Sequence, residues 1–524
     1  MSHGESPSAG LSAVDRSTSP PGLTFPRVYN AAVDLIEPNL AAGRAGKTAF
    51  IDDKGSYSYG ELAERVNRCG NALRGVGVGM EQRVMLLLLD TIDFPSAYLG
   101  AMKIGAVPIP VNTLLTGDEY AYMLRDSRAR ILVVSASLYE KVKPALADQP
   151  WLEKVIIAGP AADGHASLDA LTAKAAATLD AAPTTADDPA FWLYSSGSTG
   201  MPKGTVHVHS SLVTTAELYA RPVLGIHEND VVFSAAKLFF AYGLGNALTF
   251  PMRVGATAVL MAERPTPASV CRVLRQHRPS IFYGVPTLYA ALLASGELPA
   301  RGEHRLRACV SAGEALPEDL GKRWAQSMGV DIYDGIGSTE MLHIFISNRL
   351  GGIRYGTSGK PVPGYDARII DEHDRPVPNG EEGELIVTGP SAADGYWNQR
   401  AKTRRTFRGE WTYTGDTYIR DHDGYFRFRG RSDEMLKVSG IWVSPFEVEE
   451  ALISHPAVLE AAVVGRQDRD GLTKPKAFVI LRGNSTEFDS LVGELQSHVK
   501  DRIGVWKYPR WIEFVDSLPK TATG

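Results

Sequence analysis

The chain has 524 residues, of which 44% are hydrophobic and 22% are charged. This length exceeds what one hydrophobic core usually organises, so two or more domains are expected, and the composition excludes a disordered or fibrous protein. The 55 Lys and Arg residues nearly balance the 60 Asp and Glu residues, leaving a net charge of −5. Neither a nucleic acid nor a membrane surface is therefore expected as a partner.

The N-terminal residues 1–24 are rich in Ser, Pro and Gly and lack the apolar stretch of a signal peptide, which predicts a disordered tail. The three cysteines, Cys69, Cys271 and Cys309, lie too far apart for a CxxC motif and are expected to be buried apolar groups. No apolar stretch reaches the ~20 residues needed to cross a bilayer. The chain is expected in the cytoplasm.

Strand and helix patterns alternate from about Tyr57 onward. Apolar residues recur at helical spacing over residues 62–73 and 97–104, and continuously apolar strands are predicted at 83–89, 107–111 and 131–134. Such alternation is typical of an α/β fold. We expect a large N-terminal domain of mixed or parallel sheets flanked by helices.

Residues 359–428 differ in pattern, because short strands there alternate with turn sequences such as Asn379-Gly380 and Asp423-Gly424. This favours a small antiparallel or barrel-like unit that closes the large domain. A boundary is predicted near Arg431. The large domain then covers residues 25–430, and residues 431–524 form a small, mobile α+β C-terminal domain.

The most informative local sequence is YSSGSTGMPKG, residues 194–204, which follows an apolar strand-like segment. Glycines allow close approach of the backbone to a ligand, and hydroxyls and amides can donate to phosphate oxygens. Pro202 and Gly204 break the Walker pattern, so this is another kind of phosphate loop or a flexible surface turn. Its candidate phosphate-holding residues are Ser195, Ser196, Gly197, Ser198, Thr199, Gly200 and Lys203.

Further blocks follow in a fixed order: SAGE at 311–314, YDGIGSTE at 333–340, YTGD at 413–416, GRSD at 430–433 and LPKTATG at 518–524. Together with the loop they resemble the motifs of adenylate-forming enzymes, which include acyl- and aryl-CoA ligases, peptide-synthetase adenylation domains and luciferases. The resemblance runs from about Phe25 to the C-terminus. It implies attack of a carboxylate on the α-phosphate of ATP, followed by displacement of AMP by the thiol of coenzyme A.

The resemblance also implies roles for individual residues. Thr199 and Lys203 would hold the phosphates of ATP, Thr339 would touch the α-phosphate, and Glu340 would bind Mg²⁺. Asp416 would accept the ribose hydroxyls and Arg431 would donate to the same ribose, although an acidic turn residue alone is more often a cap. The adenine would be framed by Gly313, Glu314, Ala315, Asp334 and Gly335.

Two positions of the small domain carry further expectations from the same resemblance. Asp433 would be the hinge about which this domain turns between the two half-reactions, and Gly440 would let the pantetheine of CoA approach. Four basic residues would meet the CoA phosphates or form a solvated face: Lys474, Lys476, Lys507 and Arg510.

The acid substrate is expected to be small, aromatic and free of an amino-acid ammonium group, because Ala241 stands where peptide-synthetase adenylation domains usually carry an aspartate. The segments around Phe240 and Leu342 closely resemble those of benzoate–CoA ligases. The implied pocket residues are Ala241, Tyr242, Gly335, Gly337, His343 and Ile344. His343 has an alternative reading as a packed or surface histidine.

Other functions stay open on the sequence alone: a CoA ligase for another aryl acid such as 2-aminobenzoate, transfer to a carrier-protein thiol, and a non-catalytic adenylate-binding module. The oligomeric state is open as well, with a homodimer as one option. The family's adenylation lysine follows directly after a Thr-Gly like the one ending at Gly524, so we expect the natural protein to continue. The chain as given would adenylate weakly and retain CoA transfer better.

Overall fold

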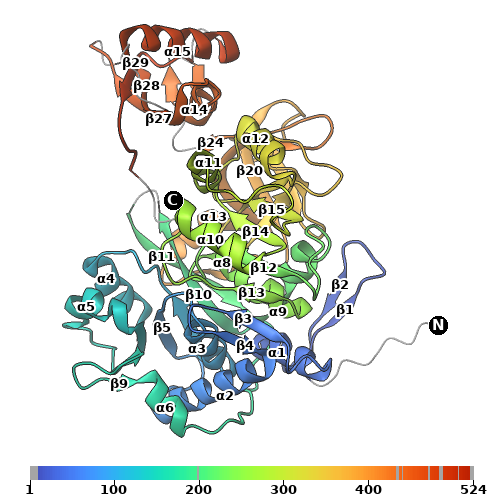
Figure 1. Ribbon diagram of the computed structural model, residues 1–524, viewed down its shortest axis with the longest axis vertical. Helices are drawn as coiled ribbons and strands as arrows, with labels where there is room; N and C mark the ends of the chain where they lie inside the picture. The colour runs from blue at the N-terminus through green and yellow to red at the C-terminus, as the bar shows by residue number, and fades with distance from the viewer. Residues whose placement is uncertain are drawn as a thin grey trace.

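The computed structural model describes residues 10–197, 200–431, 436–438, 441–469, 472–482, 488–504 and 507–519. A large domain carries several sheets, and the small C-terminal domain lies at one end of it (Figure 1). The described hydrophobic residues gather in clusters, three within the large domain and one within the small domain.

The first sheet of the large domain is a five-stranded parallel sheet in the order β6-β5-β7-β8-β9. Its helix α2 (Tyr59–Gly75) begins at a capping box in which Ser58 and Glu61 satisfy each other's backbone N–H groups. The strands and helices predicted over residues 57–134 are all present here. The bounds are α3 (Asp93–Lys103), α4 (Gly117–Ser127), β5 (Arg83–Leu87), β6 (Val107–Pro110), β7 (Ile131–Ser135), β8 (Lys154–Ala158) and β9 (Ala166–Ser167).

A second sheet has nine strands in the order β18-β17-β16-β15-β14-β12-β13-β3-β4, parallel from β3 to β16 and antiparallel at both edges. Ligands bind outside the carboxyl ends of the strands in such α/β sheets, and β16 ends at Gly337, inside the predicted motif. The strands are β3 (Thr48–Ile51), β4 (Ser56–Ser58), β12 (Val231–Ser234), β13 (Thr257–Val259), β14 (Ile281–Gly284), β15 (Ala308–Ser311), β16 (Ile332–Gly337), β17 (Ile344–Ser347) and β18 (Lys360–Pro361).

Further helices of the large domain lie around its sheets (Figure 1). They are α1 (Ala31–Ala41), α7 (His209–Thr215), α8 (Ala241–Leu244), α9 (Phe250–Val254), α10 (Pro267–His277), α11 (Pro286–Ser295) and α12 (Glu318–Met328). Two π-helical turns, η3 (Ala216–Ala220) and η4 (Gly245–Thr249), continue α7 and α8.

The loop that carries the phosphate motif joins two long antiparallel strands, β10 (Pro189–Gly197) and β11 (Gly200–Val208), and β21 (Gly395–Tyr396) pairs with β11. The turn-rich unit contains β19 (Asp366–Ile370), β20 (Glu382–Thr388), β22 (Phe407–Arg408), β23 (Trp411–Arg420) and β24 (Phe426–Arg431), all paired antiparallel. The long-range pairing of β21 with β11 brings Gly395 and Tyr396 beside Val206 and Thr205.

The small domain packs α14 (Pro445–Ile453) and α15 (Phe488–Ile503) on a sheet of β27 (Val458–Gln467), β28 (Thr473–Leu481) and β29 (Trp511–Phe514). A separate hairpin joins β25 (Leu436–Val438) and β26 (Ile441–Val443). Phe446 of α14 packs edge-on against Phe428 of the large domain, with ring centroids 5.1 Å apart. The predicted fold class, a large α/β domain with a barrel-like unit and a small α+β domain, is confirmed.

The N-terminal segment differs from the prediction of a disordered tail over residues 1–24. Residues 13–24 contain an antiparallel hairpin of β1 (Ala13–Asp15) and β2 (Gly22–Thr24) at one side of the large domain (Figure 1). Arg16 donates to both carboxylate oxygens of the fully buried Glu217, at 2.7 and 3.2 Å. This ion pair offsets the entropy cost of ordering a polar segment, which composition alone does not reveal.

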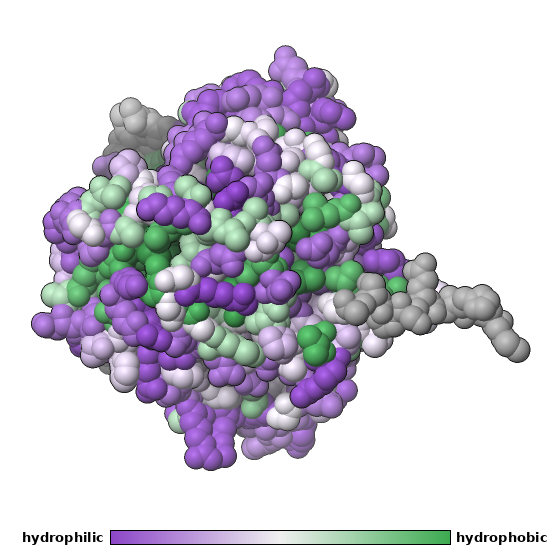
Figure 2. All heavy atoms as spheres, turned by 90° about the horizontal axis from the view of Figure 1, so that it is seen from below, coloured by the Kyte–Doolittle hydropathy of each residue, from purple (hydrophilic) through white to green (hydrophobic). Residues whose placement is uncertain are grey.

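The surface seen from below is mostly hydrophilic, with hydrophobic side chains showing between the charged ones in a band across the middle (Figure 2). Among the described residues, no helix combines the length and apolar character that a membrane crossing requires.

Candidate active site

A cavity of about 1790 Å³ lies between the large domain, the barrel-like unit and α14 of the small domain. Residues from all six predicted motif blocks line it, from Ser195 of the first block to Pro519 of the last, although these blocks are far apart in the chain. The predicted site residues along its wall are Ser195, Lys203, Gly313, Glu314, Ala315, Gly335, Gly337, Thr339, Glu340, Asp416 and Arg431.

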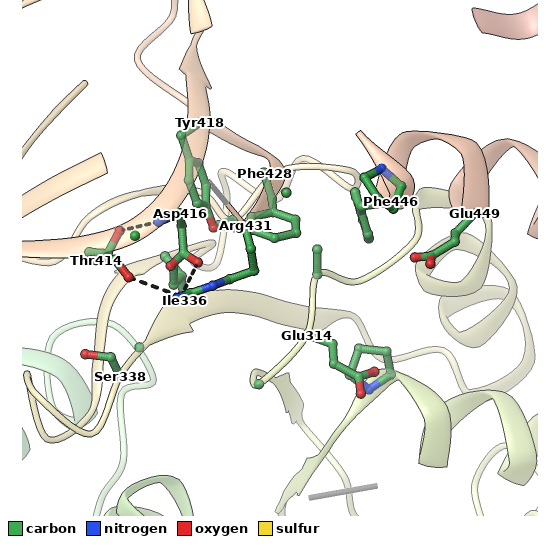
Figure 3. A pocket seen from close by; sticks show the side chains of 18 of the residues that line it. Glu314, Ile336, Ser338, Thr414, Asp416, Tyr418, Phe428, Arg431, Phe446 and Glu449 are labelled. Carbon is green, nitrogen blue, oxygen red and sulfur yellow. Dashed lines mark hydrogen bonds and ion pairs between the residues drawn. The ribbon is translucent and has the colours of Figure 1, made fainter. Parts of the chain in front are cut away.

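One end of the cavity is formed by Asp416 on β23 and Arg431 on β24, which are direct cross-strand partners. The Arg431 guanidinium donates to Asp416 Oδ1 at 2.9 Å and to the Thr414 carbonyl at 3.1 Å (Figure 3). Phe446 and Glu449 of α14 face this pair across the cavity (Figure 3). The pair therefore offers a carboxylate acceptor and a cationic donor side by side, as recognition of a diol requires.

Burial raises the pKa of Asp416 to about 6, although the Arg431 charge and hydrogen bond oppose the shift. The Asp416 side chain is only 15% exposed. Removing water from a carboxylate disfavours its charged form unless partners compensate fully. Asp416 is thus ionised at neutral pH and can accept further hydrogen bonds.

The other polar group of the cavity consists of Lys203, Glu340 and Tyr396. Lys203 Nζ lies 3.0 Å from Glu340 Oε1 and donates to the Tyr396 hydroxyl at 2.8 Å. The Tyr396 hydroxyl in turn donates to the same Glu340 oxygen at 2.7 Å. Burial raises the pKa of the Glu340 carboxyl, but the Lys203 charge and both hydrogen bonds outweigh it and hold the pKa below its usual range.

The backbone between β16 and β17 is held by His207 of β11, whose Nε2 lies 2.8 Å from the Thr339 carbonyl oxygen. A carbonyl oxygen only accepts, so Nε2 carries the proton. Burial lowers the pKa of His207 to about 4, and its ring stacks on Phe191. His207 is therefore a neutral donor that fixes the position of the Thr339-Glu340 segment.

Of the residues expected to frame the adenine, some line the cavity and one does not. Gly313, with φ +95°, adopts a left-handed backbone that favours glycine, and it lines the cavity together with Glu314 and Ala315. Asp334 does not line the cavity. Its carboxyl is buried behind β16, near the Leu316 backbone N–H at 3.5 Å, and burial holds its pKa well above the usual range.

The residues predicted for the acid pocket come from three elements: Gly335 and Gly337 from β16, Ile344 from β17, and Ala241 and Tyr242 from α8, with His343 directly before β17. The rings of Tyr242 and His343 are 5.6 Å apart, and Phe250 contacts His343 edge-on at 4.5 Å. A Cβ at Gly335 would meet the Ile344 side chain at 2.9 Å, and one at Gly337 would meet the His343 carbonyl at 2.6 Å. Both glycines therefore allow β16 to lie close to the His343-Ile344 segment.

Several predicted residues fall outside the part of the chain that the structure describes: Ser198, Thr199, Asp433 and Gly440, together with the side chain of Ser196. Gly197 and Gly200 pair with each other at the ends of β10 and β11. Of the basic residues considered for CoA, Lys476 pairs with Glu513 at 2.7 Å and Lys507 with Glu447 at 2.6 Å. Ala241 begins α8 and packs partly buried against the main core.

Three residues of the site were not identified from the sequence: Tyr396, His207 and Asn246. Tyr396 contacts Glu340, 56 residues earlier in the chain, and His207 contacts Thr339, 132 residues later. The only local signal is the Gly395-Tyr396-Trp397 run after a turn, and nothing in the sequence indicates that it pairs with β11. Asn246 contacts His343 at 3.1 Å from a π-helical turn, a feature that side-chain patterns do not reveal.

Comparison with known proteins agrees with this geometry. The profile of the family described as AMP-binding enzyme matches residues 39–397, and that of the AMP-binding enzyme C-terminal domain matches residues 447–524. The chain is 62% identical to a benzoate–CoA ligase of Thauera aromatica over 98% of each chain.

Two solved structures are also similar. A benzoate CoA ligase from Burkholderia xenovorans LB400 shares 54% identity with a TM-score of 0.89, over 95% of this chain and 98% of that one. The anthranilate CoA ligase AuaEII, in complex with anthranoyl-AMP, shares 44% identity with a TM-score of 0.91, over 95% and 96%. The resemblance predicted from the motifs is confirmed, and the chain belongs to the AMP-binding enzyme family.

Proposed function

We propose that the protein is an ATP-dependent benzoate–CoA ligase that works through benzoyl-AMP. The observation that carries the proposal is that Asp416 and Arg431, and the Lys203–Glu340–Tyr396 group, line one cavity. A nucleotide there would present its ribose to the first pair and its phosphates to the second group. The choice of an aryl acid and CoA as the other substrates is supported by the similarity to benzoate–CoA and anthranilate–CoA ligases.

The reaction has two steps. A benzoate oxygen attacks the α-phosphorus of ATP, and the bond to pyrophosphate breaks. The CoA sulfur then loses its proton, attacks the benzoyl carbonyl carbon, and the carbon–oxygen bond to AMP breaks. Both steps need positioning and charge neutralisation rather than covalent help from the protein. Lys203 supplies positive charge, and the backbone held by His207 supports Thr339.

The residues present also fit a magnesium ion. Mg²⁺ prefers one or two carboxylates plus substrate phosphates, and Glu340 is ionised because its pKa is held low. Within the described ranges, no three His, Cys, Asp or Glu side chains gather to hold a metal alone. Glu340 would therefore bind the ion together with phosphate oxygens, and the ion would neutralise developing charge on the phosphates.

The direct test measures pyrophosphate, AMP and acyl-CoA formation with ATP, Mg²⁺, CoA and a panel of benzoate, 2-aminobenzoate, phenylacetate, octanoate and an amino acid. Benzoate should give the highest kcat/KM. A protein that binds ATP and benzoate without forming benzoyl-AMP, or one that prefers octanoate, would overturn the proposal.

The turning of the small domain about Asp433 is part of this proposal. Replacing Asp433 by Pro should spare benzoyl-AMP formation and suppress the thioester step, because proline fixes φ and blocks the turn. Pyrophosphate release and benzoyl-CoA formation are measured separately. Equal loss of both half-reactions would count against a hinge.

A further inference from the structure

The segment that packs against His343 is the π-helical turn η4, which begins with Gly245 and Asn246. Single π-helical turns inside α-helices are frequent at functional sites. A Cβ at position 245 would lie 2.4 Å from His343 Cδ2, so only glycine leaves room for the imidazole here. Asn246 follows directly, is fully buried, and places Oδ1 3.1 Å from His343 Nε2.

The tautomer of His343 follows from its two neighbours. Nε2 is also 3.3 Å from the Tyr242 carbonyl oxygen, which only accepts hydrogen bonds. Nε2 therefore carries the proton, and Asn246 must turn its oxygen toward it. Burial lowers the pKa of His343 to about 3, so the ring is neutral and Nδ1 carries no proton.

The His343 ring is confined on its other sides by aromatic rings. Phe250 lies at 4.5 Å, Tyr219 at 5.2 Å and Tyr242 at 5.6 Å between centroids. This packing still allows the imidazole to rotate about its Cβ–Cγ bond. The hydrogen bond that His343 Nε2 donates to Asn246 Oδ1 opposes that rotation, because a rotated ring would leave the buried Asn246 oxygen without its donor.

We propose that Asn246 is a positioning residue that sets substrate specificity: it holds His343 as a fixed flat wall of the acid pocket, which then selects planar aryl carboxylates over saturated rings of equal carbon number. This inference rests on the proposed function and on the acid-pocket roles of Tyr242 and His343 that the sequence motifs imply. A saturated ring is thicker than an aryl ring, and a rigid wall penalises the difference. Hydrophobic pockets discriminate by roughly 10–200-fold for changes of about one methylene group.

The experiment compares benzoate with cyclohexanecarboxylate in pyrophosphate release. Asn246→Leu keeps the approximate volume and removes the acceptor, whereas Asn246→Asp retains an acceptor. Thr249→Val is the matched control, because Thr249 is also buried in η4 but its hydroxyl faces the Gly245 carbonyl at 3.5 Å. Asn246→Leu should lower the benzoate preference about tenfold through the KM for benzoate, with the KM for ATP unchanged.

The Asp and Val variants should keep the wild-type preference. If Asn246→Leu keeps it too, the inference is wrong. If that variant does not fold, the wild-type protein still provides a test by ¹⁵N NMR with labelled histidine, in which the His343 signals are identified by their loss in His343→Gln. The expected pattern at pH 7.5 is a protonated Nε2 and a bare Nδ1, and the opposite tautomer or a mixture overturns the inference. A wild type that makes no benzoyl-AMP would refute the proposed function and with it the specificity role, whereas the tautomer, which is measured without substrate, would still show whether Asn246 positions His343.

Discussion

The Tyr396 hydroxyl accepts a hydrogen bond from Lys203 Nζ and donates one to Glu340 Oε1, so one phenol joins a cation and a carboxylate on the wall of the cavity. The Lys203 ammonium also lies 4.2 Å from the centre of the Tyr396 ring. Hydrogen bonds in such a chain polarise one another, and the phenol keeps both charged groups in place before a nucleotide arrives.

Tyr396→Phe should raise the KM for MgATP about tenfold and lower the rate of benzoyl-AMP formation, while the fold is retained. The substitution removes two charge-assisted hydrogen bonds but keeps the ring beneath Lys203, and each such bond contributes about 1.5–3 kcal/mol. Pyrophosphate release at varied ATP measures both parameters. Tyr120→Phe is the control, since Tyr120 is equally large and buried but its hydroxyl donates only to the Asn112 carbonyl. Equal effects of the two variants on the KM for ATP would refute the assignment.

Asp416→Asn should make the nucleotide-free protein more stable at pH 8 and weaken ATP binding. The folded pKa of Asp416, about 6, exceeds its ordinary value of 3.8, so the folded state binds more protons than the unfolded state between these values. Stability due to this group therefore falls as pH rises from about 4 through 6, and the full cost is present above 6. Asparagine carries no charge and avoids that cost.

Thermal unfolding at pH 4.5 and pH 8, together with ATP titration, checks this prediction. The stabilisation by Asp416→Asn should be clearly larger at pH 8 than at pH 4.5. ATP should bind at least tenfold more weakly. A variant that is less stable than wild type at pH 8 would mean that the Arg431 partnership outweighs the cost of burial.

His207→Gln should destabilise the protein more at pH 7.5 than at pH 5. The folded pKa of His207, about 4, lies below its ordinary 6.5, so the unfolded state binds the extra proton between these values. The stability associated with neutral His207 is fully present above 6.5 and is lost as pH falls toward 4. At pH 5 this loss is about 2 kcal/mol, which glutamine does not incur. Urea unfolding of both proteins at both pH values measures it, and the exposed His373→Gln serves as control. A cost of substitution that does not change with pH would contradict a buried, neutral His207.

The parts of the site that the sequence predicts are those whose partners are close in the chain or belong to a motif. Asp416 and Arg431 lie on two strands joined by the Asp423-Gly424 turn, so their pairing follows from a hairpin. Tyr396 and His207 could not be predicted, because a tyrosine and a histidine have many ordinary roles and their partners are reached only through the β11–β21 pairing.

The N-terminal hairpin illustrates the same limit in the fold. Its Ser, Pro and Gly content indicates disorder, and the partner that orders it, Glu217, is 201 residues from Arg16. Periodicity predicts helices and parallel strands well because it depends on neighbours in the chain. Periodicity carries no information on a distant buried carboxylate, such as that of Glu217, that requires a cationic partner.

That buried carboxylate leads to the last prediction. Arg253 donates to Glu217 at 2.7 Å and to Asp34 at 3.2 Å, and all three side chains are at most 9% exposed. Arg253→Leu would leave two buried carboxylates short of a cation and should cost about 3–5 kcal/mol of unfolding free energy.

Arg16→Ala should cost only about 1 kcal/mol, since the Arg16 side chain is half exposed and Glu217 keeps Arg253. Denaturant unfolding of the two variants measures the difference. Glu217 lies in η3 with Tyr219, and Arg253 lies in α9 with Phe250. Since both aromatic rings pack on His343, Arg253→Leu should also raise the KM for benzoate more than the KM for ATP. Similar costs for the two arginine substitutions would show that the hairpin, rather than Arg253, neutralises the cluster.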